Sequence, residues 1–459
     1  MDLALLFPGL AALTAIAVPL YAAAVRGRFY AIFSAVLIGF SLPGALVLHA
    51  RLRAALPAFA VGPIGSIDVV DALFALSMLA AAIQLAHLVR ARMRGSLFRW
   101  LVSVPGLTFI AGGMLAGPWL LLLLPVRMLL HALGWPEAER ALTFVEALPL
   151  GIAVASVLTS VAARPETVRI ALGREGPKQL ARVAVERVRG PIAGSLREPQ
   201  APGGPTSRTD GSDVIASGRA APAHAEARSP LRIVQLTDTH LGPWQSVARL
   251  RRRVARLIAR EPDLVALTGD YLTMESMGSP GCLERALEPL GPIAERCVAI
   301  FGNHDHEAPD AVRAAMAQLG IRLLVDEEAC FDTGAGAVQV IGSDYLRRDH
   351  AERLGALLAR HPRRDAHLRL LLLHDPIGFH ALPDDDVDLV LSGHTHGGQV
   401  GLVSLGLDWT VLSRTRWPDQ GLFARGASRL YVHRGTGFYG FPLRVGVPAE
   451  YSLLEIHAP

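Results

Sequence analysis

The sequence predicts a fold in two parts, an N-terminal bundle of transmembrane helices and a C-terminal α/β domain. The chain has 459 residues, which is more than one ordinary domain, and its apolar residues are concentrated before residue 164. After residue 231, short apolar runs instead alternate with helical patterns, as is typical of a layered α/β domain. We therefore divide the chain into a transmembrane region at 1–164, a connector at 165–230 and a second domain at 231–459.

The first region contains four uncharged runs, each close to the roughly 20 residues that cross a bilayer. They cover residues 3–25, 29–50, 72–89 and 101–126. A fifth run at 147–163 is shorter, so the sequence predicts four or five spans. The first run has the length of a signal peptide, but no basic segment precedes it and further apolar runs follow.

Basic residues between the spans predict the orientation. With five crossings, ten fall on one side and four on the other: Arg26, Arg28, Arg90, Arg92, Arg94, Arg99, Arg164, Arg169, Arg174 and Lys178 against Arg51, Arg53, Arg127 and Arg140. Because cytoplasmic loops carry the excess of Lys and Arg, we expect a multi-pass protein of the inner cell membrane with its second domain in the cytoplasm. These arginines also account for the net charge of +4 without a nucleic-acid partner.

The connector divides into a basic part and a flexible part. Residues 166–189 alternate basic and apolar side chains, which predicts a helix that either lies on anionic lipid or is solvated. Residues 190–230 are rich in Pro, Gly, Ser and Ala and have no sustained apolar period. We expect this second part to be a flexible tether.

Apolar runs in the second domain predict its strands and one of its helices. The strands are expected at 232–237, 264–267, 297–301, 338–341, 368–373 and 389–391, and the helix at 247–260. The helix carries six arginines, which form either a solvated face or a contact for acidic lipid headgroups or an anionic substrate. No aromatic residues that could stack on bases are interleaved with them, so we expect no nucleic-acid partner.

Five polar motifs follow these apolar runs. They read Thr237-Asp238-Thr239-His240, Gly269-Asp270, Gly302-Asn303-His304-Asp305, His374-Asp375 and Gly393-His394-Thr395-His396. One such tripeptide alone would be typical of a turn. Because strand ends of an α/β sheet meet at a common edge, the ordered set predicts a single reaction centre.

The residue types in these motifs favour a site for two metal ions. Carboxylate, amide and imidazole ligands together suit Mn, Fe or Zn. The expected ligands are Asp238, His240, Asp270, Asn303, His374, His394 and His396. A glycine before Asp270 allows a sharp turn, so that its carboxylate can bridge the two ions. Two ions about 3.5–4 Å apart can activate water and bind phosphate oxygens.

The ordered motifs resemble the calcineurin-like metallophosphoesterase superfamily over residues 231–456. The segment GHTHGGQ at 393–399 and the segment Arg434-Gly435-Thr436-Gly437 are similar to the membrane-associated bacterial branch that includes UDP-diacylglucosamine hydrolases and related phosphodiesterases. The resemblance implies a β-sandwich flanked by helices. It also implies hydrolysis of a phosphodiester, phosphomonoester or pyrophosphate bond, with a lipid-linked or nucleotide-sugar substrate among the candidates.

The resemblance further implies a role for each site residue. One metal would be held by Asp238, His240, Asp270 and His396, and the other by Asp270, Asn303, His374 and His394. His304 would face the substrate, where it protonates the leaving oxygen or stabilises phosphoryl charge. Asp305 would orient His304.

Two questions stay open at the level of sequence. Five aromatic residues follow the last metal motif and form either an apolar lip for lipid or part of the core: Trp409, Trp417, Phe438, Tyr439 and Phe441. The alternative function is a membrane transporter or sensor whose metal-binding domain is regulatory. Paired polar residues at mid-bilayer depth in repeated halves would favour that alternative, and the sequence does not show them.

Overall fold

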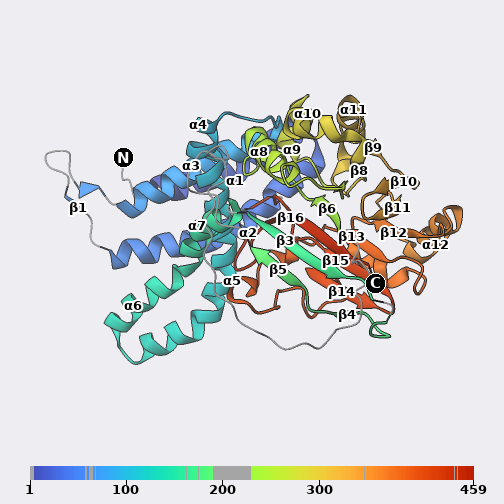
Figure 1. Ribbon diagram of the computed structural model, residues 1–459. Helices are drawn as coiled ribbons and strands as arrows, with labels where there is room; N and C mark the ends of the chain where they lie inside the picture. The colour runs from blue at the N-terminus through green and yellow to red at the C-terminus, as the bar shows by residue number, and fades with distance from the viewer. Residues whose placement is uncertain are drawn as a thin grey trace, which may run out of the picture.

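A computed structural model of the protein describes residues 5–56, 59–60, 66–67, 69–161, 163–173, 175–189, 229–345, 347–438, 440–441 and 443–458. Figure 1 shows a helical part, blue to teal, beside a domain of two sheets, green to red. The tether expected at 190–230 lies almost entirely outside the described residues, as does Tyr439.

Five helical segments are long and apolar enough to cross a membrane. They are α1 (Leu6–Val25), α2 (Arg28–Ala55), α3 (Val69–Val89), the run of α4 (Ser96–Phe98), η3 (Arg99–Ser103) and α5 (Val104–Ala132), and the run of α6 (Pro136–Glu146) and α7 (Leu148–Val161). The short strands β1 (Phe59–Ala60) and β2 (Ser66–Ile67) pair antiparallel after α2. Of the four or five spans expected, the structure therefore supports five.

Small residues bring the helices close together. A Cβ atom added to Gly113 in α5 would lie 2.4 Å from the carbonyl oxygen of Ser41 in α2. In lipid, where apolar surface gives little driving force between helices, such close backbone packing is a main source of association.

The end of the bundle that lies away from the sheets is held by buried ion pairs. Glu146 is fully buried and lies 2.5 Å from Arg51 and 2.8 Å from Arg127, and Asp71 lies 3.2 Å from Arg53. Arg51, Arg53 and Arg127 lie on the side of the membrane that is expected to carry few basic residues. These arginines are thus paired with acids inside the protein. Asp71 is accordingly part of the packing of the bundle.

The second domain is a sandwich of two seven-stranded sheets. The first has the order β10 (Glu327–Thr333), β11 (Gly336–Gly342), β12 (His367–Leu372), β13 (Leu389–Ser392), β15 (Ser428–Val432), β14 (Gly421–Arg425) and β4 (Ala181–Arg182). The second has the order β5 (Glu186–Arg189), β3 (Arg164–Ala171), β16 (Glu450–His457), β6 (Leu231–Leu236), β7 (Leu264–Leu267), β8 (Cys297–Ala299) and β9 (Arg322–Leu323). A buried apolar cluster with side chains from both sheets fills the space between them.

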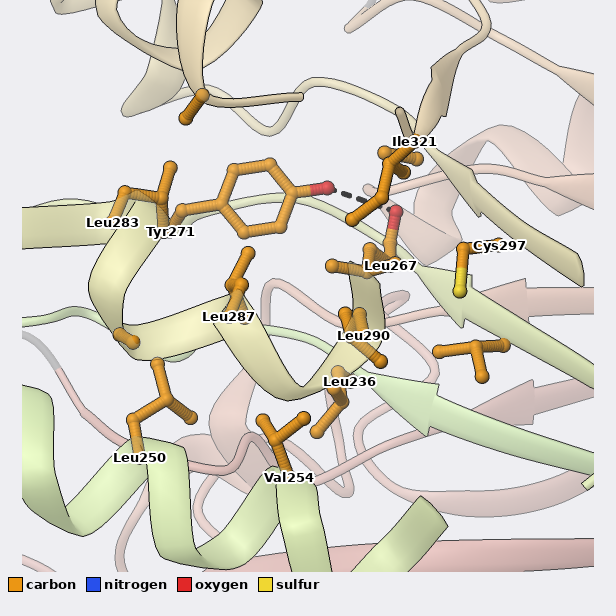
Figure 2. Packing of buried hydrophobic residues seen from close by; sticks show 14 of the residues in the cluster. Leu236, Leu250, Val254, Leu267, Tyr271, Leu283, Leu287, Leu290, Cys297 and Ile321 are labelled. Atoms are coloured by element: carbon orange, nitrogen blue, oxygen red, sulfur yellow. Dashed lines mark hydrogen bonds between the residues drawn. The ribbon is translucent and has the colours of Figure 1, made fainter. Parts of the chain in front are cut away.

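Helices cover the outer faces of the sandwich. The second sheet packs against α8 (Val247–Ile258), α10 (Cys282–Leu287), η4 (Glu288–Arg296) and α11 (Pro309–Leu319), and the first against α12 (His350–Arg360) and η6 (Pro376–Ala381). Figure 2 shows Tyr271 inside the cluster on the second sheet, where its hydroxyl donates to the carbonyl oxygen of Leu267 at 2.9 Å. The β-sandwich flanked by helices that the resemblance implied is confirmed.

The helix expected at 166–189 is wrong, because this segment forms strands of the sandwich. Strand β3 pairs in parallel with β16 along its whole length, β5 pairs with β3, and β4 pairs with β14. The alternation of basic and apolar residues has the period of a strand: Val168 and Ile170 are buried between the sheets, and Arg169 is exposed.

The bundle docks on the domain through the helix ends that lie on the arginine-rich side. After α3, the backbone N–H of Met93 donates to Ser279 Oγ at 2.8 Å. At the end of α7, Ser160 Oγ accepts from the backbone N–H of Arg444 at 3.2 Å. A small apolar cluster joins Leu107 and Val157 of the helices to Trp244 and Phe438 of the domain.

Candidate metal centre

The structure brings all seven expected ligands to one edge of the sandwich. Residues after β6, β7 and β8 of the second sheet supply Asp238, His240, Asp270 and Asn303, and residues after β12 and β13 of the first sheet supply His374, His394 and His396. The carboxyl ends of the parallel strands in both sheets meet at this edge. The site therefore spans the two layers.

The first cluster consists of Asp238, His240 and His396, whose ligand atoms all lie within 4.8 Å of one another. The Nε2 atoms of the two histidines face each other at 3.1 Å, and Nε2 of His396 lies 3.2 Å from Asp238 Oδ1. All three side chains are buried. Two imidazole nitrogens and a carboxylate oxygen converging in this way suit a divalent cation.

The second cluster consists of Asp270, His374 and His394, within the same 4.8 Å limit. Nε2 of His374 lies 3.2 Å from Asp270 Oδ2. Asn303 joins this cluster, since its Oδ1 lies 2.9 Å from His394 Nδ1.

Asp270 also connects the two clusters. Its Oδ2 atom lies 3.2 Å from His374 in the second cluster and 3.8 Å from His240 Nε2 in the first. One carboxylate thus faces imidazoles from both groups, as the sequence predicted for a bridging ligand.

His374 shows that the donors fit a metal ion. Its Nδ1 lies 2.7 Å from the carbonyl oxygen of Thr268, which can only accept, so Nδ1 carries a proton. Its Nε2 is buried and faces the Asp270 carboxylate at 3.2 Å. A ring fixed through Nδ1 with Nε2 directed into a group of acids is the usual arrangement of a metal-binding histidine.

The backbone at this edge is strained. Five of the seven expected ligands have positive φ values: 50° at Asp238, 40° at His240, 58° at Asp270, 69° at His394 and 51° at His396. Each such conformation costs a non-glycine residue about 1–3 kcal/mol, and such residues cluster at functional sites. The sharp turns aim the side chains inward from the strand ends.

Two glycines allow the loops to approach closely. A Cβ atom on Gly302 would lie 2.2 Å from Asp270 Oδ1, and one on Gly393 would lie 2.2 Å from Asp238 Oδ2. Each glycine directly precedes an expected ligand, so a larger residue at either position would push a carboxylate out of place.

Electrostatics keep both carboxylates ionised. Burial acts to raise the pKa of Asp238, but neighbouring histidines, His396 above all, hold it well below its usual range. The pKa of Asp270 is lowered in the same way, against burial, chiefly by His374. Burial lowers the pKa of His240 to about 3, so this ring is neutral and can bind a metal.

Asp305, which was expected to orient His304, contacts the backbone of the loops that carry the ligands. Its two carboxylate oxygens accept backbone N–H bonds from Asp270 at 2.7 Å, Gly302 at 2.8 Å and Tyr271 at 2.9 Å. It therefore fixes the loops that carry Asp270 and Asn303. Burial, reinforced by the charge of Asp270, raises the pKa of Asp305 to about 7.

His304 lies beside the first cluster, with its ring centroid 5.6 Å from that of His240 and its side chain 24% exposed. The residue that holds it is Glu307, whose Oε1 lies 2.9 Å from His304 Nδ1. The spacing of three residues at the start of a helical turn could have indicated this pair in the sequence.

Other residues near the site gave no signal in the sequence. The buried Arg444 donates to the carbonyl oxygens of Arg434 and Gly437 and so holds this loop next to the first cluster. A cleft of about 500 Å³ opens beside the second cluster, and its lining includes His394, Arg347 and Arg416. These residues come from loops whose contacts depend on the folded structure.

Comparison with known proteins places the site in a family. A family model described as calcineurin-like phosphoesterase matches residues 231–398. Phosphodiesterase YaeI of Escherichia coli (strain K12) is 29% identical over 233 residues, which cover 50% of this chain and 83% of that protein. The uncharacterized metallophosphoesterase YkoQ of Bacillus subtilis (strain 168) is 29% identical over 242 residues, covering 50% and 85%.

A relative with a membrane part is also found. A transmembrane protein with metallophosphoesterase domain from Danio rerio is 30% identical over 250 residues, covering 50% of this chain and 53% of that protein. This chain is thus similar to bacterial phosphoesterases and also to a vertebrate protein that is named as a transmembrane protein.

Proposed function

Because the chain carries a calcineurin-like metallophosphoesterase domain, we propose that it is a membrane-anchored phosphoesterase with two metal ions that hydrolyses a phosphodiester, phosphomonoester or pyrophosphate bond. The observation that carries this proposal is the pair of ligand clusters that share Asp270. Imidazole, carboxylate and amide donors suit manganese, iron or zinc.

The two clusters support the division of ligands that the resemblance implies. Asp238, His240 and His396 would hold one ion, Asn303, His374 and His394 would hold the other, and Asp270 would be shared. Two ions bound there would lower the pKa of water and neutralise charge on the phosphate.

The remaining residues of the site position groups and move a proton. His304, partly exposed beside the first cluster, donates a proton to the leaving oxygen. Glu307 fixes the orientation of its ring, and Asp305 fixes the loops that carry Asp270 and Asn303. Arg347 and Arg416 line the cleft beside the second cluster and would attract an anionic substrate.

The helices anchor this domain to the inner cell membrane with the catalytic site in the cytoplasm. The domain docks on helix ends that are rich in arginine, including Arg92, Arg94 and Arg99, and the opposite end pairs its arginines with buried acids. An excess of arginine marks the cytoplasmic side. An anchored enzyme meets lipid-linked substrates at high local concentration, which favours that class.

Metal content and turnover together test the function. In the full chain, Asp270→Asn removes the shared carboxylate, so both bound metal and hydrolysis of bis(p-nitrophenyl) phosphate should fall at least about a hundredfold. Asp365→Asn is the matched control, because Asp365 is exposed and lies before β12, whereas the ligand His374 follows the opposite end of that strand. If wild-type protein replete with Mn, Zn or Fe cleaves no phosphodiester, phosphomonoester or pyrophosphate probe, the proposal fails.

A further inference from the structure

An apolar pocket of about 260 Å³ lies between the helical bundle and the first metal cluster. Its wall on the bundle side is made by Phe33 and Leu37 of α2, Leu85 and Leu88 of α3, and Leu107 of α5. All five side chains belong to candidate membrane spans, and Leu37, Leu85, Leu88 and Leu107 are buried where the helices meet the domain.

The opposite wall belongs to the catalytic domain. Phe438 and Phe441 line it together with Trp244, whose ring lies 5.5 Å from that of Phe438. Phe438 and Phe441 are two of the five aromatic residues expected to form either a lip or core, and they form the boundary between bundle and domain. The lining is therefore mainly apolar, and its polar members are His240, Thr273 and Glu275 on the domain side.

His240 brings the pocket to the metal centre. It is both a lining residue of the pocket and a member of the first cluster, where its Nε2 lies 3.1 Å from that of His396. An apolar chain bound in this pocket would thus place its polar end close to the first metal cluster, where phosphate is expected to bind.

A basic cleft lies on the other side of the metal centre. It has a volume of about 500 Å³, reaches the second cluster through His394, and is lined by Arg347, Arg416 and Trp417. The metal centre accordingly lies between an apolar pocket at His240 and a basic cleft at His394. A substrate that fits both must be amphipathic.

We propose that the apolar pocket holds a hydrocarbon chain of a membrane lipid, whose phosphodiester lies at the two clusters and whose polar substituent occupies the basic cleft. This proposal rests on the proposed phosphoesterase function and names its substrate class. A lipid is favoured over an apolar peptide because residues of the candidate spans form one wall of the pocket, and acyl chains are the medium that surrounds such spans.

The reaction consumes only water. The oxygen of water forms a bond to phosphorus, the bond from phosphorus to the oxygen of the polar substituent breaks, and that oxygen takes up a proton. The products are a lipid phosphomonoester, which stays in the pocket, and a polar alcohol, which leaves through the cleft.

Two esters that differ only in chain length test the pocket. Full-length protein in phosphatidylcholine nanodiscs is given hexadecyl p-nitrophenyl phosphate or ethyl p-nitrophenyl phosphate, and the ratio of the two kcat/KM values is the readout. The variant Leu37→Trp fills the pocket and should lower that ratio by about tenfold or more, since excluding roughly two methylenes already costs that much.

The control is Val36→Trp, at the adjacent position of α2, where the side chain is 50% exposed. Partition of the long-chain ester into the nanodisc raises its local concentration equally for both variants. A ratio that falls only in Leu37→Trp therefore reports the pocket. A ratio that stays at the wild-type value in Leu37→Trp overturns the proposal and leaves the phosphoesterase function standing.

A measurement on wild-type protein avoids the chance that Leu37→Trp does not fold. Dodecyl phosphate should inhibit hydrolysis of bis(p-nitrophenyl) phosphate at a concentration at least about tenfold lower than ethyl phosphate does. Equal inhibition by the two phosphates would contradict the pocket as an acyl site. If wild-type protein hydrolyses none of these esters, the proposed function itself fails.

Discussion

His304 has the position of a proton donor rather than of a ligand. Its ring lies beside the first cluster and is held by Glu307 at 2.9 Å. Loss of a general acid typically slows a reaction about 10²–10⁴-fold, and less when the leaving group needs no proton. For His304→Ala we therefore expect hydrolysis of a dialkyl phosphate to fall much more than hydrolysis of a p-nitrophenyl ester.

The kinetic comparison needs a measurement of bound metal, because His304 adjoins Asn303. Elemental analysis of His304→Ala should find the wild-type amount. An equal loss of rate for both leaving groups would assign His304 to stabilising phosphoryl charge instead.

Asp305 stabilises the loops of the metal centre by accepting three backbone N–H bonds at 2.7, 2.8 and 2.9 Å. In Asp305→Asn, the amide group keeps only one acceptor oxygen. Its NH2 group, which is a donor, would face a backbone N–H, which is also a donor. At neutral pH, where its raised pKa leaves Asp305 only partly ionised, we expect unfolding to become easier by about 1–3 kcal/mol, the cost of a buried backbone donor left without its acceptor. Thermal unfolding of metal-free full-length protein measures this effect, and Asp365→Asn should leave it unchanged.

The ligands of the site could be predicted from the sequence, but their supporting residues could not. Each ligand follows a strand. An apolar run such as Leu389–Ser392 before His394 indicates both the strand and the position where it ends. The partner of Asp305, by contrast, is the backbone of a loop, which no residue type signals. Arg444 acts on carbonyl oxygens near the first cluster and likewise carries no local pattern.

Strand β3 is tied to the domain by buried charges as well as by its pairing with β16. Glu166 of β3 and Glu450 of β16 are both buried, and both accept from the fully buried Arg434, at 2.7 Å and 2.5 Å. Arg187, next to β3 in β5, lies 2.8 Å from Glu166 and 3.0 Å from Glu450. Removing one partner of such a network leaves another charge buried without compensation.

Glu450→Gln should therefore lower the free energy of unfolding by about 3–5 kcal/mol at neutral pH. Glu455→Gln is the matched control on the same strand: its ion pair with Arg169 is exposed, and such pairs contribute about 1 kcal/mol or less. Urea unfolding of the two variants in nanodiscs gives the comparison. Equal effects would show that the buried network adds no stability.

The same carboxylate predicts a dependence on pH. Burial acts to raise the pKa of Glu450, but Arg434, His433 and Arg187 hold it well below its usual range. Because the pKa is lower in the folded state, the stability from ionised Glu450 is present above the unfolded pKa and is lost as pH falls. Wild type should lose stability below about pH 4.5 more steeply than Glu450→Gln does.

The helix predicted at 166–189 was wrong because the sequence pattern of this segment is ambiguous. Alternating basic and apolar residues are compatible both with a helix and with a strand, and the pattern alone does not decide. The partner that makes β3 a strand is β16, which pairs Arg164 with Glu450 across most of the domain sequence. Such a contact is set by tertiary structure, and a short window of sequence does not contain it.

The two parts of the molecule were separable in the sequence because each has its own hydrophobic pattern. Runs of about 20 apolar residues indicate spans, and short runs between helices indicate a layered sandwich. The contact between the two parts could not be predicted from the sequence, because Leu107, Trp244 and Phe438 carry no local pattern that distinguishes them from other apolar residues. The pocket that reaches His240 is a property of this junction.

Fragments of the chain test how the two parts depend on each other. A fragment that begins at residue 231 lacks β3, so β16 loses one neighbour and Arg434 loses Glu166. We expect it to be largely unfolded by circular dichroism. A fragment that begins at residue 163 keeps both sheets complete and should fold in mild detergent, bind metal and hydrolyse bis(p-nitrophenyl) phosphate.

The longer fragment also decides between an anchored enzyme and a transporter or sensor that uses the domain for regulation. If the helices only anchor the domain and supply one wall of the apolar pocket, the 163–459 fragment should retain turnover of the soluble ester. It should lose the preference for the hexadecyl over the ethyl ester, because Leu37, Leu85 and Leu107 are gone. A folded, metal-loaded fragment without any turnover would mean that the bundle is required for the chemistry, and the role of the helices as an anchor would be wrong.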